Sequence, residues 1–300
     1  MANIKVWLSA MRLRTLPLSI SGIIMGGCFA FYNGSFDWRV FILAILLTIA
    51  LQILSNLAND YGDGIKGTDN ENRVGPERAL QSGKISEHNM LDAVRKNILV
   101  VVFLTVALIF AAFGTKQYLY GFLFLILGGI AMYSALTYTI GDSAYGYKGL
   151  GDFFVFVFFG LVSVIGSYFL FIKHLDHVVI LPAIALGLLS VGVLNLNNMR
   201  DIESDLLSEK ITLAVKLGKN KAKKYHLFLI IGAILVSFIF SILYYTSMWN
   251  FLFFIAYIPL VLHIKKILKA SHPDDYDSQL KILAVTTFLF SVLLGLGYIL

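Results

Sequence analysis

VFILAILLTIALQILSNLANDYGD (residues 40–63) is the stretch of sequence that decides the fold. Residues 40–57 carry no charged side chain, and a helix of about 20 apolar residues crosses the hydrocarbon core of a bilayer. Acidic residues follow directly after the apolar run. The stretch therefore predicts a membrane-spanning helix that ends in an acidic motif.

The composition of the whole chain supports the same interpretation. Of its 300 residues, 58% are hydrophobic and 14% are charged, whereas a soluble domain carries about a quarter charged residues. One core of this size cannot bury so many apolar side chains, so lipid must cover much of the surface. An ordinary soluble protein, a disordered protein and a nucleic-acid-binding protein are excluded. The single cysteine, Cys28, excludes a disulfide framework and a cysteine-based metal site.

Eight further segments are apolar and uncharged inside, which predicts an all-α bundle of nine membrane-spanning helices in one domain, residues 1–300. In chain order the nine segments are 16–31, 40–57, 98–113, 118–139, 153–172, 178–196, 227–245, 248–264 and 282–300. The first, third and eighth look short. A β-barrel would alternate polar and apolar residues, which these segments do not. The first segment lacks a clear cleavage pattern, so we expect a retained helix rather than a signal peptide.

The distribution of Lys and Arg predicts the orientation of the bundle. With a cytoplasmic N-terminus, all of the 24 basic residues except Arg39, Lys116 and Lys173 fall on the cytoplasmic side. Two long charged connections, about residues 59–96 and 197–224, also lie on that side and hold more than half of the 18 acidic residues. We therefore expect the chemistry at the cytoplasmic face.

At the start of each long connection lies a motif in which an asparagine is followed by aspartates at helical spacing. The first motif, NLANDYGD, contributes Asn56, Asp60 and Asp63. The second motif, NNMRDIESD, contributes Asn197, Asp201 and Asp205. Carboxylate and amide oxygens suit Mg²⁺, which takes one or two protein carboxylates and completes its shell with water and phosphate oxygens. The two motifs therefore predict metal sites on either side of a diphosphate.

Basic residues in the same connections could neutralise the phosphate oxygens. They are Lys66, Arg73, Arg78, Lys84, Arg200 and Lys210. Ordinary interfacial loops are the alternative, and we prefer that interpretation for the basic run 216–224. For the aspartates we reject it, because chance would seldom repeat the motif at two equivalent helix ends.

At these motifs the sequence resembles the UbiA superfamily of intramembrane aromatic prenyltransferases. The matching stretches are RLRTLPLS (12–19), NDYGDGIKGTD (59–69), GPERALQSGKI (75–85), YGYKGLGD (145–152), NNMRDIESD (197–205) and TLAVKLG (212–218). They cover nearly the whole chain in order and are most similar to the branch that prenylates 1,4-dihydroxy-2-naphthoate in menaquinone biosynthesis. The resemblance implies nine transmembrane helices with aspartate motifs at the cytosolic ends of the second and sixth.

The resemblance also implies a reaction and a location. A polyprenyl group would pass from polyprenyl diphosphate to 1,4-dihydroxy-2-naphthoate, with loss of CO₂ and diphosphate, to give demethylmenaquinone. Two Mg²⁺ ions would bridge the diphosphate, and aromatic side chains of the bundle would shield an allylic cation from water. The enzyme would lie in the bacterial inner membrane with its site open to the cytoplasm.

Site residues follow from the matching positions. The resemblance assigns metal binding to Asp60, Asp63, Asp69, Asp201 and Asp205, and catalytic roles to four of these carboxylates (Asp69 is the exception), Tyr138 and Lys148. It assigns substrate contacts to Asn56, Asn59, Lys66, Arg73, Arg78, Lys84, Asn197, Asn198, Arg200 and Lys210. Tyr145 and Tyr147 lie in the same loop as Tyr138, and an interfacial aromatic belt is the alternative for all three.

Two arginines allow two interpretations, and two positions depart from the family pattern. Arg12 and Arg14 either meet the naphthoate carboxylate or anchor the first helix. Ala79 replaces a proline common in the family, and Glu209 replaces a glycine, where a carboxylate should weaken phosphate attraction unless it points to water.

Parts of the sequence are compatible with other functions. The acceptor could be 4-hydroxybenzoate, homogentisate or haem, because related enzymes share the metal motifs. A secondary transporter would carry polar groups at the membrane midplane, whereas the ionisable residues here gather at helix ends. The histidines are scattered, and only His263 falls inside a predicted span, where a buried and satisfied side chain is expected.

Overall fold

Every regular element is helical in the computed structural model, which describes residues 3–68 and 77–300. Within these residues, nine helical segments are long and apolar enough to cross a membrane. They are Ile4–Tyr32, Trp38–Ile65, Glu87–Phe113, Tyr118–Thr137, Gly151–Ile172, His177–Arg200, Leu213–Leu243, Met248–Lys269 and Pro273–Ile299. The predicted all-α bundle of nine spans is therefore confirmed.

Some spans consist of more than one helix. The elements are α1 (Ile4–Ala10), α2 (Leu16–Tyr32), α3 (Trp38–Ile65), α4 (Glu87–Phe113), α5 (Tyr118–Thr137), α6 (Gly151–Val155), a π-helix (Phe156–Gly166), α7 (Ser167–Ile172), α8 (Ile180–Arg200), α9 (Ile202–Leu207), α10 (Leu213–Leu243), a 3₁₀-helix (Met248–Ala256), α11 (Tyr257–Lys269) and α12 (Pro273–Ile299).

Several helices begin earlier than the apolar runs predicted. The third and seventh spans start at Glu87 and Leu213, because polar turns precede the apolar stretch; in the seventh, a kink at Gly218 (φ of 73°) separates the first turn from the rest of α10. Side-chain caps fix both starts: the Ser86 hydroxyl accepts from the Asn89 amide and the Thr212 hydroxyl accepts from the Val215 amide, each at 3.4 Å. Hydropathy alone located the buried part of each helix and missed its aqueous end.

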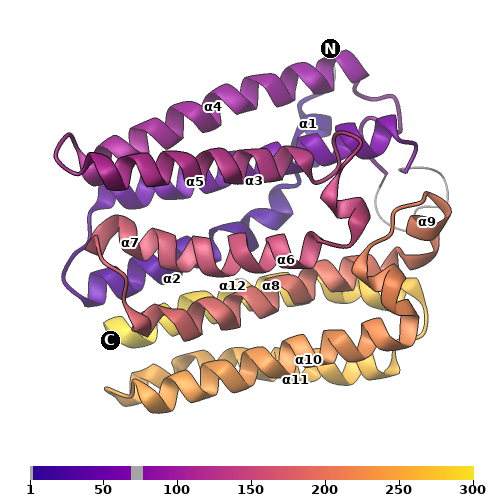
Figure 1. The fold of residues 1–300 in the computed structure, drawn as a ribbon. Coiled ribbons are helices and arrows are strands. Elements are labelled where there is room, and N and C mark those ends of the chain that lie inside the picture. Colours follow the sequence, from indigo (N-terminus) through magenta and orange to yellow (C-terminus); the bar gives the residue numbers. More distant parts are fainter. Residues whose placement is uncertain (1–2, 69–76) are drawn as a thin grey trace.

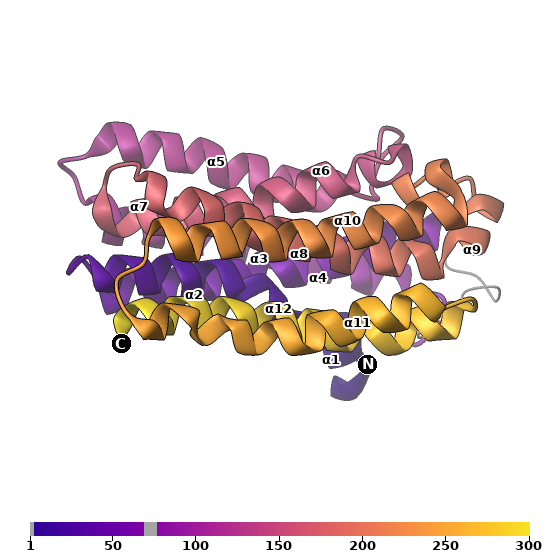
Figure 2. The same ribbon diagram turned by 90° about the horizontal axis from the view of Figure 1, so that it is seen from below.

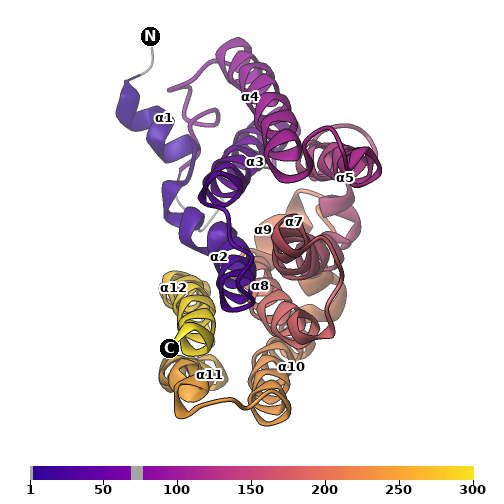
Figure 3. The same cartoon turned by 90° about the vertical axis from the view of Figure 1, so that its left-hand side faces the viewer.

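The spans form three groups when viewed along the bundle (Figure 3). Helices α3, α4 and α5 lie on one side, α10, α11 and α12 lie on the other, and α2, α7 and α8 lie between them. Figures 1 and 2 show α1 and α9 toward the same end of the bundle, with the C-terminus at the opposite end. The connections that carry the two aspartate motifs therefore share one end.

The fifth span contains 11 residues of π-helix, a form that is rare outside short bulges. Its Gly160 packs directly on α8, since a β-carbon there would lie 2.6 Å from the Cα of Gly187. Only a glycine pair permits this close approach of two backbones. The contact fixes the fifth span against the helix that carries the second motif.

A buried polar cluster joins the last three spans. His226 of α10 lies within a span, contrary to the sequence expectation, because α10 starts earlier than predicted. Its Nε2 lies 2.8 Å from Nε2 of His263 on α11, and Nδ1 of His263 lies 3.2 Å from Oε1 of Gln279 on α12. His263 is thus buried and hydrogen-bonded, as expected.

Candidate active site

The first aspartate motif lies on the last turns of α3, which continues through the motif to Ile65 as predicted. Asp60 is 1% exposed and accepts a hydrogen bond from Nη2 of Arg12. Nε of Arg78 lies 3.6 Å from the same carboxylate oxygen. A buried carboxylate requires such compensation, because an isolated charge out of water is costly.

Arg12 reaches Asp60 because the chain breaks between α1 and α2. Arg12 has a left-handed backbone with φ of 51°, which ends α1 and turns the chain into α2. Asn56 holds this break: its amide nitrogen donates to the carbonyl of Met11 at 3.0 Å. Asn56 therefore fixes the position of the arginine that pairs with Asp60.

Asp63 has a different set of partners from Asp60. The Tyr147 hydroxyl donates to Asp63 at 2.7 Å, and Nζ of Lys210 lies 3.2 Å from its second oxygen. The Tyr147 hydroxyl also lies 2.5 Å from that of Thr68. Nζ of Lys66 sits 4.3 Å from the centroid of the Tyr147 ring. Tyr147 thus connects the loop after α5 to the first motif.

The protonation states of this cluster are set by burial and by neighbouring charges. Burial by itself would lower the pKa of Lys210, but Asp63 and Asp205 raise it above its ordinary value. Burial raises the pKa of Tyr138 to about 12 and, with the charge of Asp63, also raises that of Tyr147. Lys210 is therefore cationic, and both phenols are neutral, at physiological pH.

The second motif spans the end of α8 and the start of α9. Nε and Nη2 of Arg200 donate to the two oxygens of Asp201, each at 2.7 Å. The Asn197 amide nitrogen lies 3.5 Å from Asp201. The Asp205 amide donates to the Asp201 carbonyl at 2.8 Å, which continues the helical path across the junction. Both aspartates are buried.

Lys210 follows the second motif through a tight turn. Its amide donates to the Asp205 carbonyl at 2.8 Å. Glu209 has an exposed side chain and a left-handed backbone with φ of 56°, a conformation that favours glycine. The backbone at this position therefore suits a glycine, and the exposed Glu209 side chain faces water.

The other predicted residues differ in burial and in their contacts. Lys84 forms an exposed ion pair with Glu77 at 2.6 Å. Asn59 accepts from the Thr139 hydroxyl at 3.3 Å, and Asn198 is buried on α8. Arg14 and Lys148 are exposed. Asp69 and Arg73 lie outside the described residues.

A cavity of about 340 Å³ opens beside Asp60, between α1 and the segment that begins at Glu77. Its walls are Leu8, Ser9, Ala10, Arg12, Leu13, Arg14, Asp60, Glu77, Arg78 and Ala79. Nε of Arg12 is buried and has no hydrogen-bond partner among the described residues. This volume and its three arginines suit a small ligand that carries a carboxylate or phosphate.

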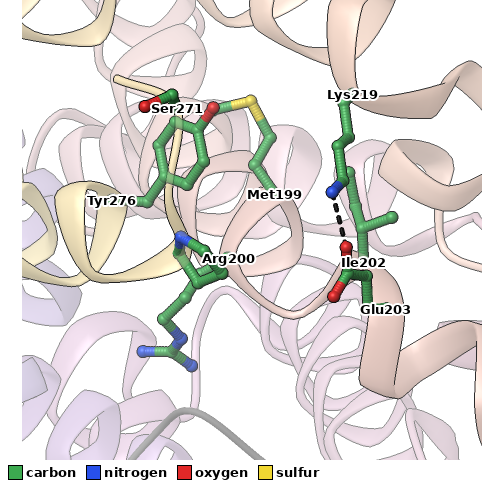
Figure 4. Close-up of a pocket in the computed structure, with 8 residues that line it drawn as sticks. Met199, Arg200, Ile202, Glu203, Lys219, Ser271 and Tyr276 are labelled. Atoms are coloured by element: carbon green, nitrogen blue, oxygen red, sulfur yellow. Dashed lines mark hydrogen bonds and ion pairs between the residues drawn. The ribbon is translucent and has the colours of Figure 1, made fainter.

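A second hollow, beside Arg200, holds about 20 Å³, room for one water molecule. Figure 4 shows the Lys219–Glu203 ion pair on one wall and Arg200 directed away from Tyr276 and Ser271. This hollow is too small for a substrate. The larger cavity and the carboxylate cluster remain the candidate site.

Mg²⁺ fits the donors that the chain offers. Among residues 3–68 and 77–300, no three His, Cys, Asp or Glu side chains converge on one point. Mg²⁺ needs only one or two carboxylates when phosphate and water oxygens complete its shell. Asp60, Asp63, Asp201 and Asp205 offer hard oxygens at one end of the bundle, so the donor chemistry agrees with the predicted metal.

These features define a multi-pass membrane protein whose buried acids and bases, at one end of the bundle, can bind a polyanion. The sequence matches the UbiA prenyltransferase family over residues 20–296. The chain therefore belongs to the UbiA prenyltransferase family, as the motifs suggested.

Individual relatives agree with this assignment. The chain is 41% identical to a 1,4-dihydroxy-2-naphthoate octaprenyltransferase of Escherichia coli (strain K12), over 98% of this chain and 94% of that protein. It is 38% identical to the Haemophilus influenzae protein of the same name, over 98% and 96%. A UbiA homologue from Archaeoglobus fulgidus, bound to GPP and Mg²⁺, shares the fold with a TM-score of 0.64 at 12% identity, over 96% and 99%.

Proposed function

We propose that the protein transfers a polyprenyl group from polyprenyl diphosphate to 1,4-dihydroxy-2-naphthoate. The ring carbon bonds to the allylic carbon as the C–O bond to diphosphate breaks. The carboxyl group leaves as CO₂, and its bonding electrons stay with the ring. The ring stays at the hydroquinone level, so the immediate product is the reduced (quinol) form of demethylmenaquinone, an intermediate of menaquinone biosynthesis.

One observation carries this proposal: the Asp63–Lys210 ion pair, 3.2 Å long, joins the last turns of α3 to the connection after α9. This contact supports one shared site for the two acidic motifs, which are more than 100 residues apart in sequence, as a diphosphate held from two sides requires. The 41% identity to a naphthoate octaprenyltransferase supports the acceptor.

The basic side chains take the role of binding the diphosphate. Lys210, Lys66 and Arg78 lie beside the aspartates and can donate to phosphate oxygens as negative charge grows on the leaving group. Tyr147 keeps Asp63 oriented through its hydroxyl. Tyr138 and Lys148 remain candidates for contact with the reacting groups.

Mg²⁺ is the proposed cofactor, with two ions for one diphosphate, and the presence of Mg²⁺ with GPP in the archaeal homologue supports the choice of metal. Its proposed ligands are Asp60, Asp63, Asp201 and Asp205, together with Asp69, which lies outside the described residues. When bound, the metal neutralises diphosphate charge and eases departure of the leaving group.

The cavity beside Asp60 is the proposed place of the naphthoate. Arg12 and Arg14 line it, and the buried Nε of Arg12 is a donor that a carboxylate oxygen can use. Arg78 lies on the same wall. The acceptor would thus enter from the aqueous end, while the polyprenyl tail lies among the apolar helices.

The proposed setting is the bacterial inner membrane, with the site open to the cytoplasm. Arg39, Lys116 and Lys173 are the basic residues at the opposite end of the bundle, and the remaining Lys and Arg follow the positive-inside pattern. A site that opens to the cytoplasm can receive a water-soluble aromatic acid from that compartment.

An acceptor assay tests the proposed function. Purified protein in lipid should form a prenylated product with farnesyl or geranylgeranyl diphosphate, Mg²⁺ and 1,4-dihydroxy-2-naphthoate, measured by mass spectrometry together with released ¹⁴CO₂ from carboxyl-labelled acceptor. The controls are 4-hydroxybenzoate, homogentisate and haem. Product with one of these acceptors, and none with the naphthoate, would contradict the assignment.

Removal of divalent metal tests the cofactor. Excess EDTA should reduce turnover at least about 100-fold, because uncompensated diphosphate is a poor leaving group. Addition of Mg²⁺ beyond the EDTA should restore the wild-type rate, which controls for damage to the protein. Turnover that persists in EDTA would show that the reaction needs no divalent metal.

A further inference from the structure

Arg200, the last residue of α8, is completely engaged by neighbouring side chains. Its side chain is 3% exposed. Nε and Nη2 bind the two oxygens of Asp201, each at 2.7 Å, and Nη2 also donates to Asn197 at 3.0 Å. Nη1 donates to Asp277 at 2.5 Å. Carboxylates therefore occupy both edges of the guanidinium.

This arrangement differs from the sequence expectation that Arg200 binds diphosphate. A guanidinium has five N–H donors in a rigid plane. Here one edge forms the bidentate pair with Asp201, and the other edge points to α12, where Asp277 lies. The hollow on the other side of Arg200, about 20 Å³, has room for only one water molecule, and Figure 4 shows that the guanidinium points away from it.

Asp277 comes from a separate span, 77 residues further along the chain. It lies in the second turn of α12, which begins at Pro273, and its side chain is about half exposed. Arg200 and Asp201 are adjacent in sequence, so they move together unless a third group restrains the arginine. Asp277 is that third group.

We propose that Asp277 is a positioning residue for prenyl transfer: it anchors Arg200, and Arg200 thereby fixes the plane of the Asp201 carboxylate. The inference rests on the proposed function, in which Asp201 serves the diphosphate and its metal. Hydrogen-bond partners of ligating carboxylates set the direction of the ligand oxygens, and their loss costs about 10- to 100-fold in metal affinity or activity.

A direct role of Arg200 on the diphosphate predicts the opposite result. In that case Asp277 would compete with the substrate for the same guanidinium. Removing the Asp277 charge would then release Arg200 and tighten binding of the prenyl diphosphate. The sign of the change in KM therefore separates the two roles.

The experiment compares Asp277→Asn, Asp277→Glu and wild type in nanodiscs. Asp274→Asn is the matched control, because Asp274 is an exposed acid in the first turn of the same helix. Steady-state rates give kcat and KM for geranylgeranyl diphosphate. A second readout needs no turnover: the rise in Tm that geranylgeranyl S-thiolodiphosphate produces with Mg²⁺.

We expect Asp277→Asn to lower kcat/KM for geranylgeranyl diphosphate about 10- to 100-fold and to raise its KM. The analogue should stabilise this variant less than wild type, whereas the Tm without ligand should stay near that of Asp274→Asn. Asp277→Glu should recover most of the loss, because it keeps the charge that binds Nη1. Asp274→Asn should match wild type.

Unchanged or tighter binding by Asp277→Asn would overturn the proposal. If that variant does not fold, Asp277→Ser and Arg200→Lys decide: independent, additive losses in their double mutant would show that Asp277 does not act through Arg200. Failure of the proposed function is separable, since wild type would then bind the thiolodiphosphate but leave the naphthoate unchanged.

Discussion

Asp60→Ala and Asp201→Ala should each reduce prenyl transfer by roughly 1,000-fold while the protein stays folded in the membrane. Asp60 is 1% exposed and lies between Arg12 and Arg78, and Asp201 is held by both edge donors of Arg200. In an alanine variant, neither water nor a neighbouring side chain can supply the missing negative charge. The rate of product formation with polyprenyl diphosphate, Mg²⁺ and naphthoate measures the loss.

The variants need a control for stability, because removing one partner of a buried ion pair destabilises a protein by about 3–5 kcal/mol. Asp60→Asn and Asp201→Asn keep the shape of the side chain and should be as inactive as the alanine variants. Asp92→Ala, which changes a partly exposed acid near the start of α4 that pairs with Arg95, should retain wild-type turnover. Near-normal turnover in either Asp60 or Asp201 variant would refute a site built on both motifs.

Apolar runs predicted the fold well because the bilayer imposes one condition on every span. Each backbone polar group in the hydrocarbon must bond within its own helix, so uncharged stretches of sufficient length become helices. The ends of the helices were less predictable. Glu87 and Leu213 begin helices because Ser86 and Thr212 cap them, a local effect that hydropathy does not measure.

The candidate site was predictable as far as helical spacing determined it. Asp60 and Asp63 share the end of α3 because the helix continues, as the motif suggested. Helical spacing does not predict the partners of these aspartates, because Tyr147, which donates to Asp63, lies 84 residues further along the chain. The sequence identifies Tyr147 only as one of several aromatic residues in this loop, and the YGYK stretch around it is the feature that could have indicated its role.

Two further features, the contact of Asp277 with Arg200 and the backbone break at Arg12, are not indicated by the neighbouring sequence. Asp277 follows an ordinary helix start, and only the packing of α12 on α8 brings it to Arg200. Arg12 adopts a left-handed backbone although it is not glycine, and the Asn56 contact with Met11 stabilises that break. Contacts between distant spans depend on the packed bundle, which residue spacing does not specify.

Lys210 contacts residues of both acidic motifs, so its replacement should have the second large effect on prenyl transfer. Its ammonium lies 3.2 Å from Asp63 and 5.4 Å from the centroid of the Tyr147 ring, and its amide binds the Asp205 carbonyl. Asp63 and Asp205 hold its pKa above the ordinary value, so it stays protonated across the range in which the enzyme can be assayed. It is therefore a permanent positive charge at the proposed diphosphate site.

Lys210→Met should lower kcat/KM for polyprenyl diphosphate about 100-fold, because a charge-assisted donor to the leaving group is lost. Lys221→Met is the matched control: Lys221 is exposed in the basic run 216–224, which we assign to lipid headgroups, so its kinetics should stay near wild type. Lys210→Arg keeps the charge and should recover part of the rate. Equal, small losses in Lys210→Met and Lys221→Met would mean that both lysines serve the membrane surface and that the diphosphate is held elsewhere.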